Sequence, residues 1–169
     1  LVVGGSYDGG DDAELRRLVR DLHETLYDEQ GSGLAAPQLG VGLRAFAFHV
    51  DGVEGTLVNP VLDFPDDEEQ DGPEGCLSMP GIYIDTIRRQ NVVARGFTEH
   101  GDPLQIVGSG YLARCLQHET DHLDGVLFID RMDTPRRRAA LRALREAPWA
   151  QDGAPRVKIS PHAAPNPFR

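Results

Sequence analysis

The chain has 169 residues, of which 40% are hydrophobic and 26% are charged, and its formal net charge is −10. This length is sufficient for one domain with its own core, and no apolar run is long enough to cross a membrane. The acidic balance argues against DNA as a partner, because nucleic-acid binding needs clustered lysine and arginine. We therefore expect a single domain over residues 1–147, followed by a Pro-rich C-terminal tail over residues 148–169.

The first predicted element is a helix that Asp11 or Asp12 caps and that Gly31 ends. Its apolar positions recur at helical spacing and form one face: Leu15, Leu18, Val19, Leu22 and Leu26. A helix with one apolar face packs that face against a core.

The middle of the chain consists of short β-prone segments separated by turn residues. Strands are expected at 44–50, 56–62, 83–87, 91–97 and 104–107. A turn near Asp51 and Gly52 joins the first two of these strands, and residues 66–71 form an acidic loop.

A second helix begins after Ser109, which can cap it, and ends at Gly125. A short strand at 126–129 follows, and Pro135 opens a last helix that runs to Arg145. Helices combined with strands that do not alternate with them regularly indicate an α+β fold. We expect mixed, mainly antiparallel sheets around the second helix.

The sequence His118-Glu119-Thr120-Asp121-His122, an HExxH motif, lies on this second predicted helix. Residues four apart share one face of a helix, so both imidazoles can point at a single divalent ion. Glu119 is better placed to handle a proton of a water on that ion than to be a third ligand from the same turn. Two histidines also occur four apart by chance in structural helices. A buried histidine pair beside a glutamate is costly unless something satisfies it, and a metal does so directly.

The third ligand decides which class of metal site this is. Zinc peptidases with the same motif usually take it from downstream, where the chain offers Asp124, Asp130, Asp133 and His162. None of these is well placed. Cys76 is the stronger candidate, because Glu74-Gly75-Cys76-Leu77-Ser78 is followed by Met79-Pro80-Gly81, whose glycine and proline impose a defined backbone path. One thiolate and two imidazoles leave a fourth position open, as in catalytic rather than structural sites.

The second cysteine, Cys115, precedes His118 by three residues on the same predicted helix. We interpret it as a small buried apolar side chain, since free cysteine is among the most buried residue types. Two cysteines with separate roles leave none for a disulfide. This usage fits a reducing compartment, and we expect a cytoplasmic location.

With these residues identified, the chain resembles the peptide deformylase family. Three separated motifs carry the resemblance: Gly31-Ser32-Gly33-Leu34-Ala35-Ala36-Pro37-Gln38, Glu74-Gly75-Cys76-Leu77-Ser78, and His118-Glu119-Thr120-Asp121-His122-Leu123-Asp124-Gly125. Their order and spacing also agree with the family, and the similarity runs from about residue 11 to residue 132. Residues 1–147 are then the catalytic domain.

The resemblance implies a metal-dependent hydrolase that removes the formyl group from the N-terminal formyl-methionine of nascent polypeptides and releases formate. It implies that Cys76, His118 and His122 bind one divalent ion. The native ion expected in this family is Fe²⁺, which Zn²⁺, Ni²⁺ or Co²⁺ can replace.

The resemblance also implies roles for other residues. Glu119 takes a proton from the water on the metal and passes it to the departing amine, while the Gln38 side-chain amide and the Leu77 backbone N–H donate to the oxyanion. Gly33 and Gly75 let substrate or neighbouring backbone approach closely. The expected pocket for the methionine side chain is lined by Leu34, Tyr83, Cys115 and residues near His118.

Three positions allow a second interpretation from the residues alone. A glutamine after Ala-Ala-Pro can simply cap a turn or face water, which is the alternative interpretation of Gln38. Arg88 lies where the family usually carries an arginine after the second motif, and it either orients that segment or is a solvated surface residue. Thr120 stands where the family often has a hydrophobic residue; it keeps a methyl group and adds a hydroxyl.

Two rival functions remain open at this stage. One is a same-fold enzyme that removes a formyl or acyl group from a small molecule, and the other is a non-catalytic homologue that keeps the metal for its fold. A conventional metallopeptidase is a further alternative. The basic run Arg136-Arg137-Arg138 is typical of a solvated helix face, with contact to ribosomal RNA near the exit tunnel as the alternative. The sequence leaves the oligomeric state open.

Overall fold

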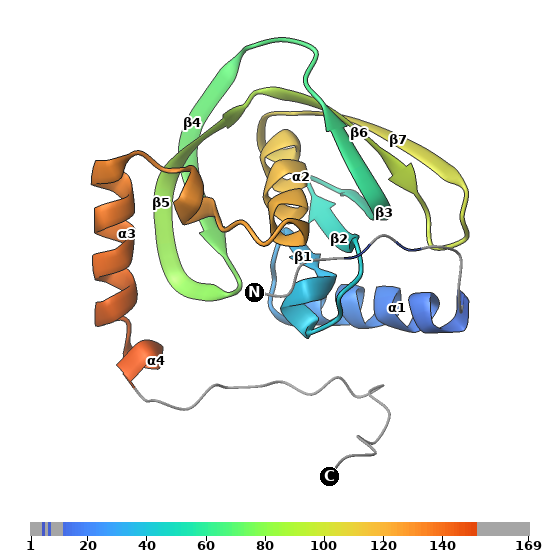
Figure 1. Cartoon of the computed structure of the whole chain (residues 1–169), viewed down its shortest axis with the longest axis horizontal. Helices are drawn as coiled ribbons and strands as arrows, with labels where there is room; N and C mark the ends of the chain where they lie inside the picture. The colour runs from blue at the N-terminus through green and yellow to red at the C-terminus, as the bar shows by residue number, and fades with distance from the viewer. Residues whose placement is uncertain (1–4, 6, 8–11, 152–169) are drawn as a thin grey trace.

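The computed structural model describes residues 5, 7 and 12–151 of the chain (Figure 1). The N-terminal half of the fold contains α1 (Asp12–Asp28), β1 (Gly33–Ala35), the 3-10 helix η1 (Ala36–Leu39), β2 (Ala45–Val50), β3 (Val53–Asp63) and β4 (Glu69–Cys76). The remainder contains β5 (Met79–Arg89), β6 (Asn91–Phe97), β7 (Pro103–Ser109), α2 (Gly110–Leu123), the 3-10 helix η2 (Phe128–Arg131), α3 (Thr134–Glu146) and α4 (Pro148–Gln151).

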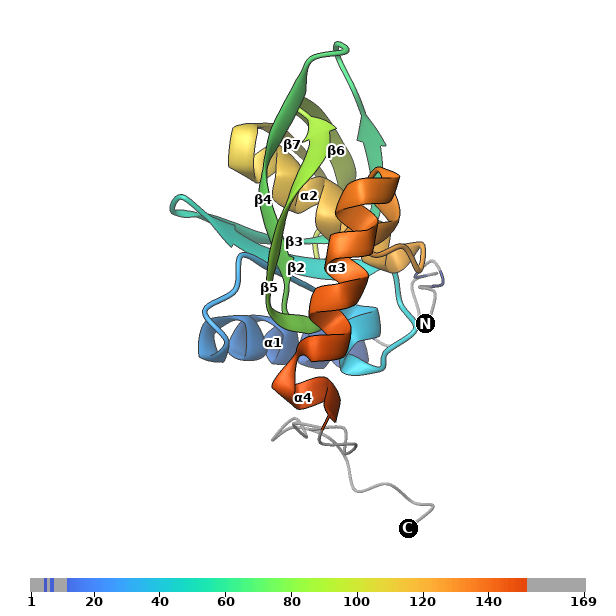
Figure 2. The ribbon, with the colours of Figure 1, turned by 90° about the vertical axis from the view of Figure 1, so that its left-hand side faces the viewer.

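The strands form two sheets that share no strand. Five strands pair antiparallel in the order β1-β2-β3-β6-β7, while β4 and β5 pair only with each other and form a long two-stranded arm over residues 69–89. Figures 1 and 2 show α2 lying between the five-stranded sheet and this β4–β5 arm, with α3 on the far side of the arm. The expected α+β fold with mainly antiparallel sheets around the HExxH helix is confirmed.

The tight turn expected at Asp51 and Gly52 joins β2 to β3. Both residues have positive φ, 51° and 80°, which is the conformation of a two-residue hairpin whose twist matches that of its strands. Further along β3, the register with β6 shifts between Val58 and Val61. Pro60 lies in this irregular stretch, where the missing proline N–H breaks no regular ladder.

Helix α1 packs its apolar face against one side of β1 and β2. The buried side chains of this cluster are Leu15, Leu18, Val19, Leu22, Leu26, Leu34, Ala36, Ala45, Ala47 and Val58. The helix ends earlier than the glycine suggested. Gln30 adopts the left-handed conformation with φ 52°, and the Gly31 N–H donates back to the Leu26 carbonyl at 3.1 Å. The left-handed residue that ends the helix is therefore Gln30, and Gly31 is the residue after it.

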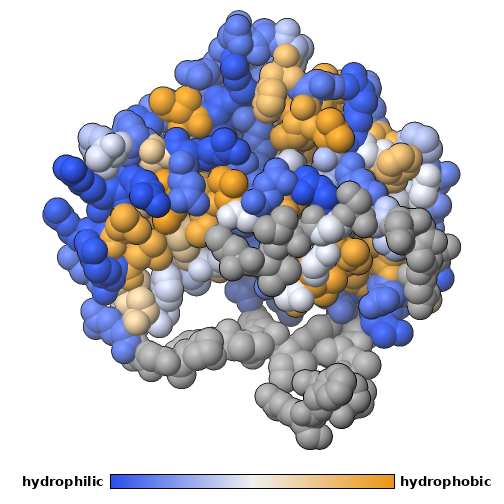
Figure 3. All heavy atoms as spheres, in the orientation of Figure 1, coloured by the Kyte–Doolittle hydropathy of each residue, from blue (hydrophilic) through white to orange (hydrophobic). Residues whose placement is uncertain are grey.

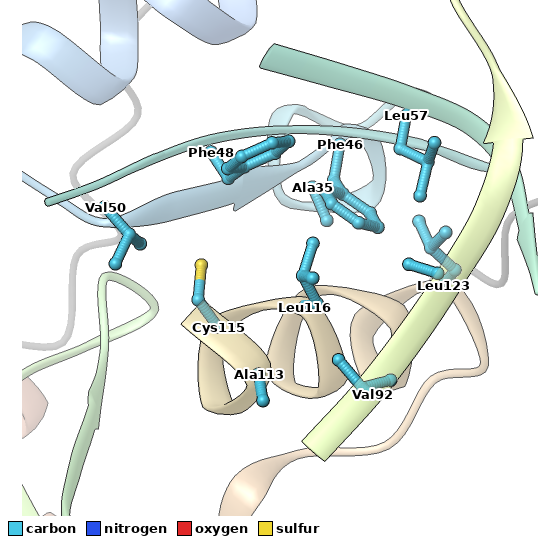
Figure 4. Close-up of a cluster of buried hydrophobic side chains, with 11 residues drawn as sticks. Ala35, Phe46, Phe48, Val50, Leu57, Val92, Ala113, Cys115, Leu116 and Leu123 are labelled. Carbon is cyan, nitrogen blue, oxygen red and sulfur yellow. The ribbon is translucent and has the colours of Figure 1, made fainter. Parts of the chain in front are cut away.

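Helix α2 packs one face against the other side of the sheet. Figure 4 shows Leu116 pointing from α2 toward Phe46, with Leu57, Val92 and Leu123 closing the same cluster. Ser109 occupies the N-cap position as expected, but its side chain makes no capping hydrogen bond. At the other end, Gly125 has φ 70° and terminates the helix as the sequence predicted.

Two expected segments differ from the structure. Residues 126–129 are not a strand: Phe128 and Ile129 begin the 3-10 helix η2, and the Leu127 N–H donates to the Asp130 carboxylate at 3.1 Å. Within the described residues this segment pairs with no strand; its apolar side chains pack against the arm and α3 in a cluster with Met79, Ile82 and Ala140. The acidic loop is also shorter than expected, because β4 already begins at Glu69.

The segment expected to be a Pro-rich tail begins with the short helix α4. Residues 152–169 lie outside the described part of the chain. Within the described residues, none of the helices has the length and apolarity needed to cross a membrane. On the face shown in Figure 3, hydrophilic residues separate the exposed apolar ones into several groups.

Candidate metal centre

Three side chains from two elements converge at the junction of the β4–β5 arm and α2. Cys76 ends β4 at the tight turn into β5, and His118 and His122 lie one helical turn apart on the face of α2 that looks toward it. Their ligand atoms all lie within 4.8 Å of one another. The His122 Nε2 atom is 3.3 Å from Cys76 Sγ and 3.2 Å from His118 Nε2.

The orientation of His118 fits a metal ligand. Its Nδ1 atom is 2.6 Å from the Glu74 Oε1 atom, so the hydrogen bond fixes the ring and leaves Nε2 for an ion. Burial acts to lower the pKa of His118, but hydrogen bonds to Cys76 and Glu74 outweigh it and raise this pKa to about 10. Burial and the charge of His118 lower the pKa of His122 to about 3.

Glu119 lies directly beside the two histidines and is 3% exposed. Its Oε2 atom has no hydrogen-bond partner among the described residues, and burial raises its pKa to about 7. A Cβ atom on Gly33 would lie 2.3 Å from Glu119 Oε1. Strand β1 therefore approaches this carboxylate so closely that only glycine fits, and the buried, unpartnered Oε2 atom is available for a proton.

Gln38 is held beside the same centre by both ends of its amide. Its Oε1 atom accepts a hydrogen bond from the Ala35 N–H at 2.8 Å, and its Nε2 atom donates to Ser78 Oγ at 3.0 Å. The Nε2 atom is also 3.8 Å from Cys76 Sγ. The two interpretations of Gln38 are compatible, since one end of the amide caps a turn and the other faces the metal ligands.

The other residues predicted to line the pocket differ in where their side chains lie. Tyr83 is exposed at the rim, where its ring packs on Gly75 so closely that a Cβ there would lie 2.5 Å from it. The Leu34 side chain is instead buried in the α1 cluster. The Leu77 side chain also packs against that cluster. The role expected for Leu77 involves only its backbone N–H, so this packing does not conflict with it. Cys115 is buried, and its Sγ atom lies 3.3 Å from the Ser32 carbonyl.

A cavity of about 380 Å³ opens onto these groups. Its lining is Glu29, Gln30, Gly31, Ser32, Gly33, Gln38, Glu74, Gly75, Cys76, Leu77, Pro80, Gly81, Tyr83, Tyr111, Arg114, Cys115, His118 and Glu119. Leu34 does not line it. The motifs at 31–38, 74–78 and 118–122 thus meet around a single space large enough for a peptide end.

A buried charge network adjoins the centre. Arg88 is 6% exposed and pairs with Glu74 and Asp121, both at 2.6 Å, so its interpretation as a solvated surface residue was wrong. Arg114 and Arg131 complete the network through Glu74 and Asp121 respectively. Sequence reasoning missed the two acidic members as functional residues.

A signal for Arg88 was present in the sequence. Alternate residues of β5 face inward, and Ile82, Ile84, Thr86 and Arg88 are its inward positions. A strand that places an arginine in such a series requires a buried carboxylate opposite it. Thr120 has a simpler account: its hydroxyl donates to the Leu116 carbonyl at 2.8 Å, so the departure from a hydrophobic residue leaves no unpaired polar atom.

Comparison with known proteins agrees with this geometry. Residues 5–138 match the family described as polypeptide deformylase. The peptide deformylase of Acidothermus cellulolyticus is 59% identical over 89% of this chain and 83% of its own length, and that of a Parafrankia species is 57% identical with the same coverage. The crystal structure of a peptide deformylase from Legionella pneumophila superposes with a TM-score of 0.80 at 36% identity, covering 90% of this chain and 91% of that one. The chain belongs to the polypeptide deformylase family of metal-dependent hydrolases, which remove the formyl group from nascent peptides.

Proposed function

We propose that Cys76, His118 and His122 hold one divalent ion, Fe²⁺ natively with Zn²⁺, Ni²⁺ or Co²⁺ as substitutes, and that the chain uses this centre to hydrolyse the formyl group of N-terminal formyl-methionine. The observation that carries the proposal is the convergence of three ligand atoms beside a buried carboxylate with an unpartnered oxygen. One soft thiolate with two imidazoles suits first-row transition metals. Three protein ligands leave room for water and substrate.

The chemistry of a formamide sets what the residues must do. A formamide is a poor electrophile, so its hydrolysis needs an activated water, a polarised carbonyl and a protonated leaving amine. A bound ion supplies the first two by lowering the pKa of water and by withdrawing charge from the carbonyl oxygen. Glu119 accepts the proton of the attacking water at Oε2 and later gives it to the amine nitrogen. Its neighbour Gly33 leaves the space in which this carboxylate sits.

Gln38 and Leu77 are proposed to stabilise the oxyanion that develops on the formyl oxygen. The Gln38 Nε2 atom already points toward Cys76, and the bond from Ala35 to its Oε1 atom fixes which end of the amide donates. The Leu77 backbone N–H follows Cys76 directly and comes from the tight turn between β4 and β5. Donors fixed in this way are worth about 3 kcal/mol each in well-studied enzymes.

The peptide part of the substrate has a place to bind along β1. This strand stands at one end of the five-stranded order, and among the described residues no strand pairs with its outer edge, which would suit an extended peptide. Gly33 and Gly75 are proposed to allow the close approach of that peptide, and Leu34 acts through its backbone because its side chain belongs to the core. The substrate is then the N-terminus of a formylated nascent chain, not a free small molecule.

We infer a cytoplasmic location, because nascent chains arise there and both cysteines are free. A contact with the ribosome through Arg136-Arg137-Arg138 has less support. Arg136 pairs with Asp71 at 2.6 Å and Arg137 with Asp130 at 3.2 Å, so two of these three charges are already partnered within the molecule.

The proposal is tested by measuring formate release from formyl-Met-Ala-Ser, with metal content determined on the same anaerobic sample. Glu119→Gln keeps the size of the side chain and removes its base. We expect this variant to bind the metal and to lose activity by a factor of about 10³, within the range that general acid–base groups contribute. Wild-type protein that holds stoichiometric metal but releases no formate contradicts the proposal and favours a small-molecule substrate.

A further inference from the structure

One wall of the cavity is a face of α2 that extends beyond the metal ligands. Tyr111, Arg114, Cys115 and His118 line the cavity and stand at positions i, i+3, i+4 and i+7. Residues at this spacing share one side of a helix. The wall that runs from the metal centre toward the start of α2 therefore carries a guanidinium group, where an apolar side chain would suffice to contact a hydrocarbon substrate.

The guanidinium of Arg114 is buried and fixed through one nitrogen. Its Nη1 atom donates to Glu74 Oε2 and to the Thr86 carbonyl, both at 2.7 Å, and the side chain is 5% exposed. The Nη2 and Nε atoms have no partner among the described residues. A Cβ on Gly72 would lie 3.7 Å from Nη2, so the glycine leaves space beside this donor.

The position of Arg114 matches the reach of the first substrate side chain. Arg114 precedes His118 by four residues, a rise of about 6 Å along the helix. The sulfur of formyl-methionine lies at a comparable distance from the formyl carbon by covalent geometry. A methionine side chain that followed the α2 wall away from the metal would therefore end near Cys115 and Arg114.

Resting on the proposed function, we propose that Arg114 is a specificity-determining residue that donates a hydrogen bond from Nη2 to an acceptor at the end of the first side chain. The thioether sulfur of methionine is a weak acceptor, and the oxygen of methionine sulfoxide is a stronger one. Norleucine has nearly the same shape and no acceptor. Sites built to hydrogen-bond a substrate group discriminate against analogues that lack it, because the site's polar group is left unpaired.

The test compares kcat/KM for three formylated tripeptides that begin with methionine, methionine sulfoxide or norleucine and continue Ala-Ser. The measured quantity is the sulfoxide-to-norleucine ratio within one preparation, which does not depend on the fraction of active protein. We expect a ratio of at least about ten in the wild type. Arg114→Met removes the donors and keeps the length, and we expect it to bring the ratio to about one.

Two further variants separate recognition from folding. Gly72→Val leaves the bonds of Arg114 to Glu74 and Thr86 in place but fills the space beside Nη2, so it should lower the ratio in the same direction. Arg89→Met, on the exposed edge of the arm, is the matched control and should leave the ratio unchanged. A wild-type ratio of one or less, or a ratio that Arg114→Met and Gly72→Val do not change, overturns the inference. Wild-type protein that releases formate from none of the peptides overturns the proposed function instead.

Discussion

The Glu74 carboxylate is hydrogen-bonded to three side chains, those of Arg88, Arg114 and His118. Burial acts to raise its pKa, but the hydrogen bonds and charges of His118 and Arg88 outweigh burial and lower the pKa to about 2. The Glu74 carboxylate is therefore ionised at neutral pH. It can hold the His118 ring in one orientation while its other oxygen accepts from the two arginines.

At the residue scale, Gly33→Ala is a sensitive change. The added Cβ would meet Glu119 Oε1 at 2.3 Å, and β1 cannot retreat because it is paired with β2. We expect the Glu119 carboxylate to be displaced. Formate release should then fall by a factor of about 100, because a displaced carboxylate transfers the proton less efficiently. Metal content should stay at the wild-type level, because Cys76 and the histidines are not touched.

Gly5→Ala is the control for this change, since its Cβ would make only an ordinary contact of 3.5 Å with the Gly42 carbonyl. Its activity should equal that of the wild type. Full activity of Gly33→Ala would show that the position of Glu119 is not what limits the reaction.

At the element scale, β5 presents adjacent arginines to opposite environments. Arg88 points inward to Glu74 and Asp121, whereas Arg89 points outward to Asp67, which is 97% exposed. Removing one member of a buried ion pair leaves uncompensated charge and costs about 3 kcal/mol or more. An exposed pair contributes less than about 1 kcal/mol.

We therefore expect Arg88→Met to lower the free energy of unfolding by about 3 kcal/mol, with Arg89→Met close to the wild type. Urea unfolding followed by circular dichroism measures both variants under one condition. Equal free energies of unfolding for the two variants would mean that the network around Asp121 rearranges without a cost in stability.

The elements could be predicted from the sequence where local chemistry decides them. The apolar spacing of α1, the Asp51-Gly52 turn and the spacing of His118 and His122 each specify their own structure. The segment 126–129 could not be predicted, because a four-residue apolar run fits a buried strand or a buried turn equally. Only the packing of its Phe128 against the β4–β5 arm distinguishes them.

The candidate site follows the same division. Cys76, His118, His122 and Glu119 could be proposed from the sequence because a metal demands particular atoms at particular spacings, and the first three do lie together in the structure. The burial of Leu34 and the pairing of Arg88 depend on how distant segments meet, which composition and periodicity do not contain. Family resemblance supplied the role of Gln38, and the geometry around its amide is consistent with that role.

At the scale of the whole molecule, the C-terminal end of the described chain is connected to the rim of the cavity. Trp149, the single tryptophan, donates from Nε1 to the Pro80 carbonyl at 2.9 Å. Pro80 and Gly81 in turn line the cavity. A peptide that displaces this rim changes the surroundings of the indole.

We expect tryptophan emission to change saturably when Glu119→Gln protein, which binds without turnover, is titrated with formyl-Met-Ala-Ser. Trp149→Phe, which removes the fluorophore and its hydrogen bond, is the control and should also show a severalfold higher KM in the active background. Calorimetric binding without any change in emission would exclude the connection between α4 and the rim.

The placement of Cys76 on the β4–β5 arm has a thermodynamic consequence. The arm shares no strand with the main sheet, and Cys76 meets the histidines of α2 only across the centre. An ion held there as proposed would act as a cross-link that closes the chain between Cys76 and His118, and closing a long loop removes entropy chiefly from the unfolded ensemble. Because such an ion would bind only the native state, the free energy of unfolding would rise with the logarithm of the free metal concentration. Removing the metal would then lower the stability of the fold as well as the activity.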